Sequence, residues 1–331
     1  MLNWDDDLCL PGCGLFLDSR RARPWCFVSH AHGDHIGEHE RALCTPATAA
    51  LAERRIALGR LTEVPYGREV EFDGDTRVTL HPAGHILGSA MLHLRRAEGS
   101  FLYTGDFKLR SCLTVECAAP VAADYLLMET TYGLPMFRFP RRELVIEQLL
   151  TIVEEAFRGG RQPIVMGYSL GKGQEIVRIL TDAGHAVTCH GAVWHNNEVY
   201  QRLGTPLGSY RRYVFEDFHG PGAMDLRERG VLVAPPQVAR SAFVTRFENP
   251  CRIILTGWGL LKNAIYRYGV DHALPLSDHA DFDELLELVE RVGPRKVFTH
   301  HGYREFVDTL RSRGIDATHA YNDPQLTLFG E

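Results

Sequence analysis

The segment Val28–His35 constrains this chain most, because it places three histidines and one aspartate within six positions, directly after a short apolar run. The run predicts a buried strand that ends at Ser29, with a helix beginning near Asp34. Imidazole and carboxylate groups are the ligands that Zn²⁺ and Mn²⁺ prefer. The ligand-type side chains are His30, His32, Asp34 and His35. His30 and His32 can point one way and Asp34 and His35 another, so one loop could supply ligands to two adjacent ions.

A polar loop with chance histidines is the alternative interpretation. The chain has 16 histidines in 331 residues, and at that frequency four ligand-type side chains seldom fall in such a pattern. Cys9 and Cys13 are also candidate metal ligands, but the chain offers no second cysteine pair for a closed site.

Length and composition indicate an ordinary globular protein of about two domains, with 45% hydrophobic and 24% charged residues. No apolar run approaches the roughly 18 residues of a membrane span, and the acidic start Met1–Asp7 is unlike a signal peptide. The eight cysteines form no C-x-x-C pair, which is typical of free thiols in a reducing cytosol. We therefore expect a cytoplasmic protein without a membrane partner.

The net charge of −6 excludes a protein that binds nucleic acid by a basic surface as a whole. A nucleic-acid substrate would have to be held by metal ions and a local basic patch. Two patches are candidates, although each is more often a solvated face: Arg20, Arg21 and Arg23, and Arg138, Arg141 and Arg142.

The first third of the chain is rich in strand-like segments, and Asp73-Gly74-Asp75 predicts a hairpin between two of them. The expected strands are Leu15–Asp18, Trp25–Ser29, Glu69–Phe72, Arg77–His81, Ala90–Leu94 and Phe101–Thr104. A helix is expected over Ala47–Leu58, and a buried strand over Tyr125–Glu129.

After Gly133 the pattern changes to alternating helices and strands, which predicts a parallel α/β arrangement. The expected elements are the helices Arg141–Arg158 and Gln174–Leu180 and the strands Pro163–Gly167, Gly230–Ala234 and Arg252–Thr256. Ligand-type residues return from about Ser277, followed by the helix Asp283–Val292 and the strand Lys296–Thr299. Site residues at both ends, with an α/β stretch between them, indicate a domain inserted within a domain.

His85 and Asp106 complete the constellation, because each lies at an expected strand end. The order Asp18, His30 to His35, His85, Asp106 resembles the metallo-β-lactamase superfamily. Further motifs resemble its β-CASP branch of nucleases, and within it the bacterial ligase-associated DNA exonucleases. These motifs are Met128–Gly133, Leu276–Asp281, Phe298–Gly302, Gly133–Pro140, Tyr168–Gln174, His190–Val193 and Leu255–Leu260.

The resemblance implies a metallo-β-lactamase αββα sandwich with a small inserted β-CASP α/β domain. Residues 1–134 would form the first part of the metallo-β-lactamase domain, residues 135–271 the insertion, and residues 272–331 the return segment. The resemblance also implies a DNA substrate, single-stranded or a duplex end, and a functional link to a DNA ligase or repair set.

Two divalent ions, Zn²⁺ or Mn²⁺, are implied as cofactors. One ion would be held by His30, His32 and His85, the other by Asp34, His35 and His301, with Asp106 between them. Asp18 would orient a ligand or the attacking water. Such a pair of ions clamps a phosphodiester and activates water for in-line attack, leaving a 5′-phosphate and a 3′-hydroxyl.

His279 is the candidate acid for the leaving oxygen, with Glu129 as its hydrogen-bond partner. The alternative is a structural histidine at a helix start, with Ser277 or Asp278 as the N-cap. His300 and His301 compete for one ligand position, and His301 is preferred because it precedes Gly302, as in the family pattern.

The turn Ser169–Gln174 follows a strand and opens a helix, so Ser169, Gly171 and Lys172 are candidate phosphate contacts. A tight turn with a surface lysine is the alternative. Tyr132 and Phe137 could stack a nucleobase, and core packing is at least as good an interpretation.

Three other function classes compete with a DNA exonuclease. An RNA-processing nuclease fits the same motifs, and the short insertion favours DNA. A glyoxalase-type hydrolase would need the seven ligands but would leave Glu129 and His279 without a role. A binding module without metals is hard to reconcile with a complete ligand set. Analogy with the DNA members favours digestion from a 5′ end, and the native metal and oligomeric state stay open.

Overall fold

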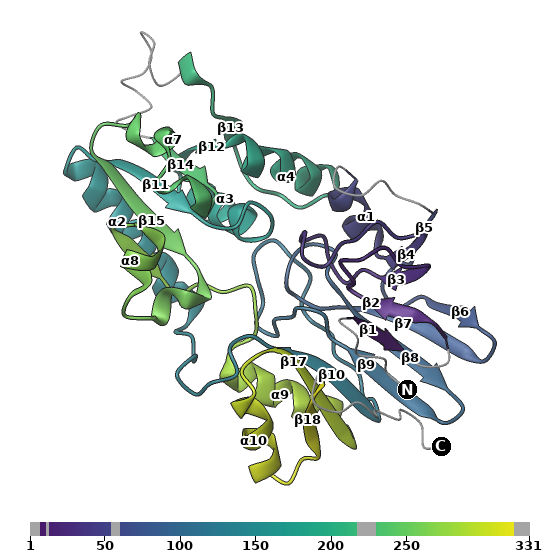
Figure 1. The fold of residues 1–331 in the computed structure, drawn as a ribbon. Helices are drawn as coiled ribbons and strands as arrows, with labels where there is room; N and C mark the ends of the chain where they lie inside the picture. The colour runs from purple at the N-terminus through teal and green to yellow at the C-terminus, as the bar shows by residue number, and fades with distance from the viewer. Residues whose placement is uncertain (1–6, 11–12, 54–59, 217–229, 321–331) are drawn as a thin grey trace. The chain divides into compact units, whose positions relative to one another are not determined.

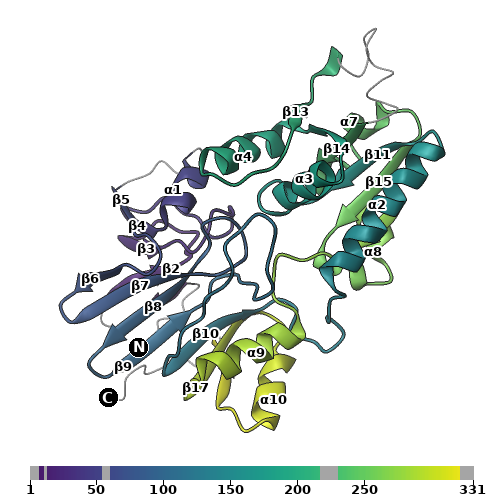
Figure 2. The ribbon, with the colours of Figure 1, turned by 180° about the vertical axis from the view of Figure 1, so that it is seen from behind.

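The computed structural model describes residues 7–10, 13–53, 60–216 and 230–320. The chain divides into two compact units (Figures 1 and 2). Unit 1 comprises residues 1–138 and 279–331, and unit 2 comprises residues 139–278. The boundaries expected from sequence, after residues 134 and 271, lie four and seven positions earlier than these. No described helix is long and apolar enough to cross a membrane.

Unit 1 contains a five-stranded and a seven-stranded sheet. The first has the order β1-β2-β3-β4-β5, and the second has the order β18-β17-β10-β9-β8-β7-β6. The strands of the first sheet are β1 (Leu8–Leu10), β2 (Leu15–Leu17), β3 (Trp25–Phe27), β4 (Arg41–Cys44) and β5 (Arg60–Glu63). Those of the second are β6 (Glu69–Asp73), β7 (Thr76–Pro82), β8 (Ala90–Arg96), β9 (Gly99–Tyr103), β10 (Tyr125–Thr130), β17 (Lys296–Gly302) and β18 (Ala317–His319).

The two sheets face each other across one apolar layer. Leu17 and Phe27 of the first sheet belong to the same buried cluster as Leu92 and Leu127 of the second. The outer face of the second sheet packs on α9 (Phe282–Val292) and α10 (Glu305–Ser312). α1 (Pro46–Ala52) covers the outer face of the first sheet. The layers therefore run helix, sheet, sheet, helices, which confirms the predicted αββα sandwich (Figure 1).

Local sequence explains how the strands of unit 1 form. Buried and less buried side chains alternate along β7, as expected for a strand with one face on the core. The predicted hairpin joins β6 and β7 as an antiparallel pair, and Gly74 takes the left-handed backbone (φ 55°) that the turn requires. β10 is apolar on both faces because it lies between β9 and β17, each parallel to it.

Unit 2 is built on a six-stranded parallel sheet of order β13-β12-β14-β11-β15-β16. Its strands are β11 (Gln162–Met166), β12 (Ala186–Cys189), β13 (Tyr210–Arg212), β14 (Gly230–Ala234), β15 (Pro250–Leu255) and β16 (His272–Leu274). The helices in its described residues include α2 (Arg142–Arg158), α3 (Lys172–Asp182), α4 (Gly191–Arg202), α7 (Ala242–Thr245) and α8 (Ala264–Tyr268), with the 3₁₀ turns η1 (Pro236–Val238) and η2 (Gly257–Leu260). The predicted parallel α/β pattern is confirmed.

Two expected helices differ from the structure. No helix begins near Asp34, where the described chain forms turns and bends through residue 40. Gly37 explains this, because a side chain there would meet the Ser19 carbonyl oxygen at 2.8 Å, so this loop packs against the Asp18 loop. The helix expected over Ala47–Leu58 is α1, which ends at Ala52, and residues 54–59 lie outside the described chain.

Gly302 allows β10 and β17 to approach closely beside the site. Its φ is +82°, and a Cβ there would lie 1.8 Å from the Thr130 carbonyl oxygen. Gly302→Ala should therefore lower the free energy of unfolding by about 3 kcal/mol or more, because two backbones must separate. Urea unfolding followed by circular dichroism measures this loss.

Gly293→Ala is the matched control. Gly293 also has a positive φ (+62°), but no atom lies within 4 Å of the position that a Cβ would take there. This substitution should cost only about 1 kcal/mol, the strain of the left-handed backbone. Equal losses in the two variants would contradict the close-approach argument.

Candidate metal centre

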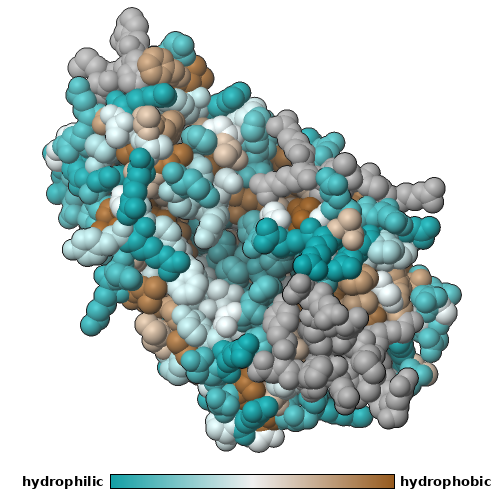
Figure 3. Space-filling view, viewed as in Figure 1, coloured by the Kyte–Doolittle hydropathy of each residue, from teal (hydrophilic) through white to brown (hydrophobic). Residues whose placement is uncertain are grey.

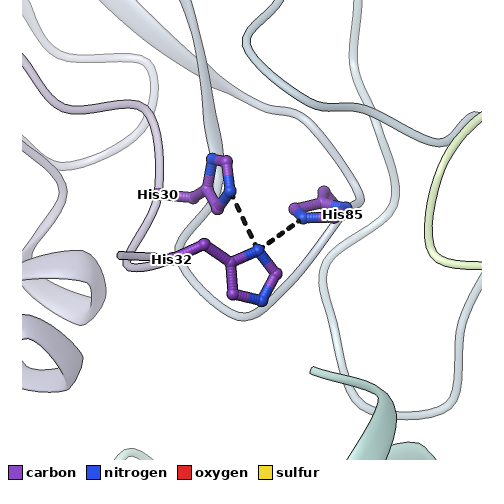
Figure 4. A group of neighbouring side chains, drawn as sticks. All are labelled: His30, His32 and His85. Carbon is purple, nitrogen blue, oxygen red and sulfur yellow. Dashed lines mark hydrogen bonds between the residues drawn. The ribbon is translucent and has the colours of Figure 1, made fainter. Parts of the chain in front are cut away.

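Three imidazole nitrogens converge in unit 1 (Figure 4). His30 Nε2 lies 3.0 Å from His32 Nδ1, and His85 Nε2 lies 3.1 Å from the same atom. Ligand atoms about 2.1 Å from a tetrahedral ion lie about 3.4 Å apart, so these spacings fit a shared metal ion. Burial and the neighbouring histidines hold the pKa of His30 well below its usual range. That favours the neutral imidazole that a metal requires.

Backbone turns hold these histidines in place. Ser29 Oγ lies 2.9 Å from His30 Nδ1 and so leaves Nε2 to face the cluster. The Ser89 hydroxyl oxygen accepts the backbone N–H of His85 at 3.0 Å, which fixes the loop between β7 and β8. Gly84 permits that loop because a Cβ there would lie 2.2 Å from the Lys108 carbonyl oxygen.

Asp106 lies among the histidines. Its Oδ2 is 3.3 Å from His35 Nε2, 3.7 Å from His30 Nε2 and 3.9 Å from His85 Nε2. Burial by itself would raise the pKa of Asp106, but His35 and His279 hold it well below the usual range. Gly105 has a φ of 53° and follows the end of β9. A Cβ added at Gly105 would lie 2.6 Å from the Cβ of Ser29, so only glycine allows this close approach. The carboxylate therefore touches both halves of the predicted ligand set.

His35 and Asp34 form the second half of the set. Burial by itself would lower the pKa of His35, but Asp106 and Asp18 raise it well above the usual range. These two carboxylates thus favour positive charge beside the His35 ring. Asp34 Oδ2 is 4.0 Å from His35 Nε2, and its side chain is 71% exposed.

His301, the preferred ligand of the adjacent pair, lies on the same side as His35. Their ring centroids are 6.3 Å apart, and both line one cavity of about 340 Å³ with Asp18 and Asp34. His300 is fully buried, and its ring packs 5.4 Å from that of Tyr103. The backbone of His301 is left-handed (φ 50°), which turns its side chain out of the strand alternation.

Asp18 organises this side of the site. Its Oδ2 accepts hydrogen bonds from the Tyr103 hydroxyl at 2.8 Å and the Ser29 hydroxyl at 2.6 Å, and lies 2.9 Å from His35 Nδ1. Asp18, Asn249 and His301 are the non-glycine residues with positive φ in the described chain. Strained backbone of this kind concentrates at functional sites. Sequence reasoning missed Ser29 and Tyr103 as partners of Asp18; the alternation of β9, which turns Tyr103 inward, was the available signal.

Asp18→Asn should reduce metal affinity and activity about 10- to 100-fold, because a neutral amide orients the His35 ring less firmly through Nδ1 than the carboxylate does. Metal content after dialysis and initial hydrolysis rates measure the two effects. Tyr103→Phe removes one of the bonds to the same oxygen and should have a smaller effect on both. A loss for Tyr103→Phe that equals the loss for Asp18→Asn would contradict an orienting role centred on His35.

Glu129 and His279 form a pair beside the cluster. His279 Nδ1 lies 2.8 Å from Glu129 Oε1, which also accepts the Phe107 N–H at 3.0 Å. Glu129 is 1% exposed and His279 is partly exposed, with its ring centroid 4.6 Å from that of His85. Glu129 lies at the end of β10, beside the end of β9, so its carboxylate is fixed by backbone groups.

The helix start near His279 differs from both suggested caps. Asp281 is the N-cap of α9, and its side chain accepts the N–H groups of Asp283 and Glu284. Ser277 and Asp278 do not cap the helix. His279 therefore lies in the approach to the helix, two residues before the cap, and its ring is left for the contact with Glu129.

Contacts within unit 2 count against the predicted phosphate site. Lys172 is 1% exposed, and its Nζ lies 2.7 Å from the carboxylate of Glu175. The Gly171 N–H donates to Gln174 Oε1 at 2.7 Å, and the Ser169 carbonyl oxygen accepts from Gln174 Nε2 at 3.1 Å. Gln174 thus satisfies backbone hydrogen-bonding groups of the turn. The lysine expected at the surface is instead part of a buried ion pair.

Other sequence candidates are engaged elsewhere. Tyr132 and Phe137 are buried against each other, so their rings pack in the core and are not offered to a base. Arg138 pairs with Asp283, and Arg23 pairs with Asp7. Burial raises the pKa of the Cys9 thiol to about 11, which opposes the thiolate that a metal would need. All eight cysteines are free.

Comparison with known proteins matches the chain to a family of metallo-hydrolases and to longer relatives. Residues 267–322 match the family described as "Zn-dependent metallo-hydrolase RNA specificity domain". A protein of Opitutus terrae named "Probable DNA ligase" is 41% identical over 324 residues, which cover 97% of this chain and 31% of that protein. A "Transcription termination factor FttA" of Methanothermobacter thermautotrophicus is 26% identical over 296 residues, covering 72% of this chain and 46% of that protein.

The chain thus spans about a third and about half of these two relatives. A solved structure of a protein of unknown function from Enterococcus faecalis V583 has a TM-score of 0.60, with 14% identity. The structural match covers 94% of this chain and 80% of the Enterococcus faecalis chain. At 14% identity the match shows similarity of fold alone.

Proposed function

The chain belongs to the β-CASP metallo-β-lactamase family, and from that premise we propose that it is a metal-dependent nuclease that hydrolyses phosphodiester bonds of DNA. The observation that carries this proposal is the Glu129–His279 pair beside the histidine cluster. A phosphodiester needs both a cationic site for phosphate and a proton for the leaving oxygen, and unit 1 holds candidates for both.

The ligand set would hold two divalent ions, Zn²⁺ or Mn²⁺. His30, His32 and His85 would hold one, and Asp34, His35 and His301 the other, with Asp106 between them. When bound, such ions supply charge that stabilises the developing negative charge on phosphate, and they activate water as a nucleophile. The cavity beside His35 and His301 leaves room for a phosphate group on this side of the cluster.

Protein groups would orient the ligands and move one proton. Asp18 fixes the ring of His35 through Nδ1, so Nε2 faces Asp106. Glu129 accepts a hydrogen bond from His279 Nδ1, so the proton available for transfer lies on Nε2. Transfer of that proton to the leaving 3′ oxygen would give a 3′-hydroxyl and a 5′-phosphate.

DNA is the preferred substrate, with digestion from an end as part of DNA repair in the cytoplasm. The 41% identity over nearly the whole chain to a protein named as a probable DNA ligase supports a link to strand joining. RNA is the second candidate, because the family model over residues 267–322 carries RNA specificity in its description. A glyoxalase-type reaction would leave the Glu129–His279 pair without a role.

Metal-free protein should be inactive, and addition of Mn²⁺ or Zn²⁺ should restore cleavage of labelled single-stranded DNA. Strands labelled at the 5′ or the 3′ end report exonuclease polarity, and we expect nucleotides to be released from the 5′ end. An RNA strand of the same sequence tests the second candidate: faster cleavage of RNA would reverse the substrate assignment. Full activity in a chelator would contradict metal-dependent hydrolysis.

A further inference from the structure

A basic and aromatic surface in unit 2 is not used by the mechanism above. It consists of Arg240, Trp258, Lys262, Tyr266, Arg267 and Tyr268. We refer to these six residues as the η2–α8 patch, because all but Arg240 lie on or beside those two elements. Tyr266 is 81% exposed, more than any other large hydrophobic residue described. Figure 3 shows hydrophobic side chains scattered among hydrophilic ones on the face drawn, so exposure alone decides nothing.

Cation–aromatic contacts organise the patch. The Arg267 guanidinium carbon lies 5.5 Å from the Trp258 ring centroid and 5.7 Å from that of Tyr268. Arg240 donates a hydrogen bond to the Tyr266 carbonyl oxygen at 2.6 Å. Arg240 also crosses Gly269, where a Cβ would lie 2.4 Å from its Nε. The side chain of Arg240 therefore braces the helix turn that presents Tyr266.

The patch is positive although the protein is acidic. Residues 256–270 contain no aspartate or glutamate, against a net charge of −6 for the chain. Among the described residues, no ion pair joins Arg240, Lys262 or Arg267 to a carboxylate. The nearby Asp271 instead pairs with Arg161 at 3.1 Å and Arg252 at 3.4 Å. Within the part of the chain that the structure describes, these three cations therefore have no carboxylate partner.

The patch lies where parallel sheets bind ligands. η1 and η2 follow directly from the carboxyl ends of β14 and β15, which flank β11 in one parallel sheet. Gly259 of η2 packs against the end of β16, where a Cβ would meet the Leu274 carbonyl oxygen at 2.7 Å. Ligand sites of open α/β sheets collect at this edge. α8 contacts η2 and β16 in the same unit.

We propose that the η2–α8 patch binds a single-stranded segment of the nucleic-acid substrate outside the hydrolytic site. Tyr266 would stack on a base, and Lys262 and Arg240 would contact phosphates. Exposed aromatic rings beside cations are how proteins hold single strands without reading their sequence, because every base offers a π face. The inference rests on the proposed nuclease function, since it takes the substrate to be a polynucleotide.

The test measures binding apart from cleavage. Affinity for fluorescent dT20 and rU20 is measured in EDTA for the full chain, for Tyr266→Ala and for Tyr266→Phe. We expect Tyr266→Ala to weaken binding about tenfold, because a stacked base is lost, and Tyr266→Phe to bind as wild type. The two oligonucleotides distinguish DNA from RNA as the occupant. Leu144→Ala is the matched control, since Leu144 is also exposed in unit 2 but neighbours Glu143.

Salt dependence tests the charge component. Lys262→Ala should reduce the slope of log affinity against log salt by about 0.7, the value for one phosphate contact of a single strand. Equal affinity of wild type, Tyr266→Ala and Lys262→Ala for both oligonucleotides would contradict the proposal that the η2–α8 patch binds a single strand.

Hydrolysis of a small chromogenic phosphodiester separates the two proposals, because this ester has no polynucleotide strand for the patch to bind. Tyr266→Ala should cleave it at the wild-type rate. A wild-type protein that cleaves neither this ester nor nucleic acid would contradict the nuclease function instead.

Discussion

Replacement of His85 by alanine is expected to reduce nuclease activity about 1,000-fold or more and to lower the metal content of the purified protein. The His85 ring contributes one of the two nitrogens that lie within 3.1 Å of His32 Nδ1, and it approaches Asp106 from a different loop. A bound ion is worth several kcal/mol of transition-state stabilisation, and each 1.36 kcal/mol is tenfold in rate. Elemental analysis and initial rates on labelled DNA measure the two losses.

His93→Ala is the matched control for this experiment. His93 lies on β8, the strand that follows the His85 loop, and it is partly buried like His32. It faces His81, with ring centroids 5.8 Å apart, and joins none of the ligand clusters of the described chain. It should keep both metal and activity. Wild-type metal content in His85→Ala would remove His85 from the proposed ligand set.

Replacement of His279 by alanine is expected to slow cleavage of DNA by about 10²- to 10⁴-fold while the metal content stays unchanged. The reason is loss of the ring that would donate a proton to the leaving oxygen and that contacts Glu129 through Nδ1. A leaving group that needs no proton separates this role from a structural one. Hydrolysis of a p-nitrophenyl phosphodiester should therefore fall far less than hydrolysis of DNA.

Glu129→Gln extends the test, because it keeps the shape of the side chain and removes its charge. The amide should reproduce part of the His279→Ala defect on DNA and little of it on the activated ester. Equal losses on the two substrates in either variant would assign the pair a structural role. Loss of metal in His279→Ala would instead place that ring among the ligands.

Much of the architecture of unit 1 could be predicted from sequence because strand signals are local. Apolar alternation located β7 and β8, and Asp73-Gly74-Asp75 located the turn before β7. The loop after β3 was harder, since the expected helix near Asp34 gives way to a packed turn. Its conformation depends on Gly37 meeting the backbone of Ser19, a contact between segments 18 residues apart.

In unit 2, too, the role of a turn could not be predicted from its sequence. The sequence around Gly171 is typical of a phosphate-binding turn, but Gln174 caps that turn and Glu175 neutralises Lys172. Capping by a side chain three residues away competes with an external anion for the same N–H groups. The spacing of residues in the sequence cannot distinguish a turn capped by its own side chain from a turn that binds an anion, because both use the same residue types.

The sequence by itself determined which side chains are available for chemistry, because ligand type, charge and strand periodicity are properties of short segments. Histidines at 30, 32 and 35 predict a metal site from one short segment. Only the tertiary structure decided which of them meet. His85 reaches His32 across 53 positions, and Glu129 reaches His279 across 150. The first contact joins loops of two facing sheets, one after β3 and one between the antiparallel strands β7 and β8. The second joins the end of β10 to the segment before α9. Both depend on packing of the whole core, which no short segment of sequence specifies.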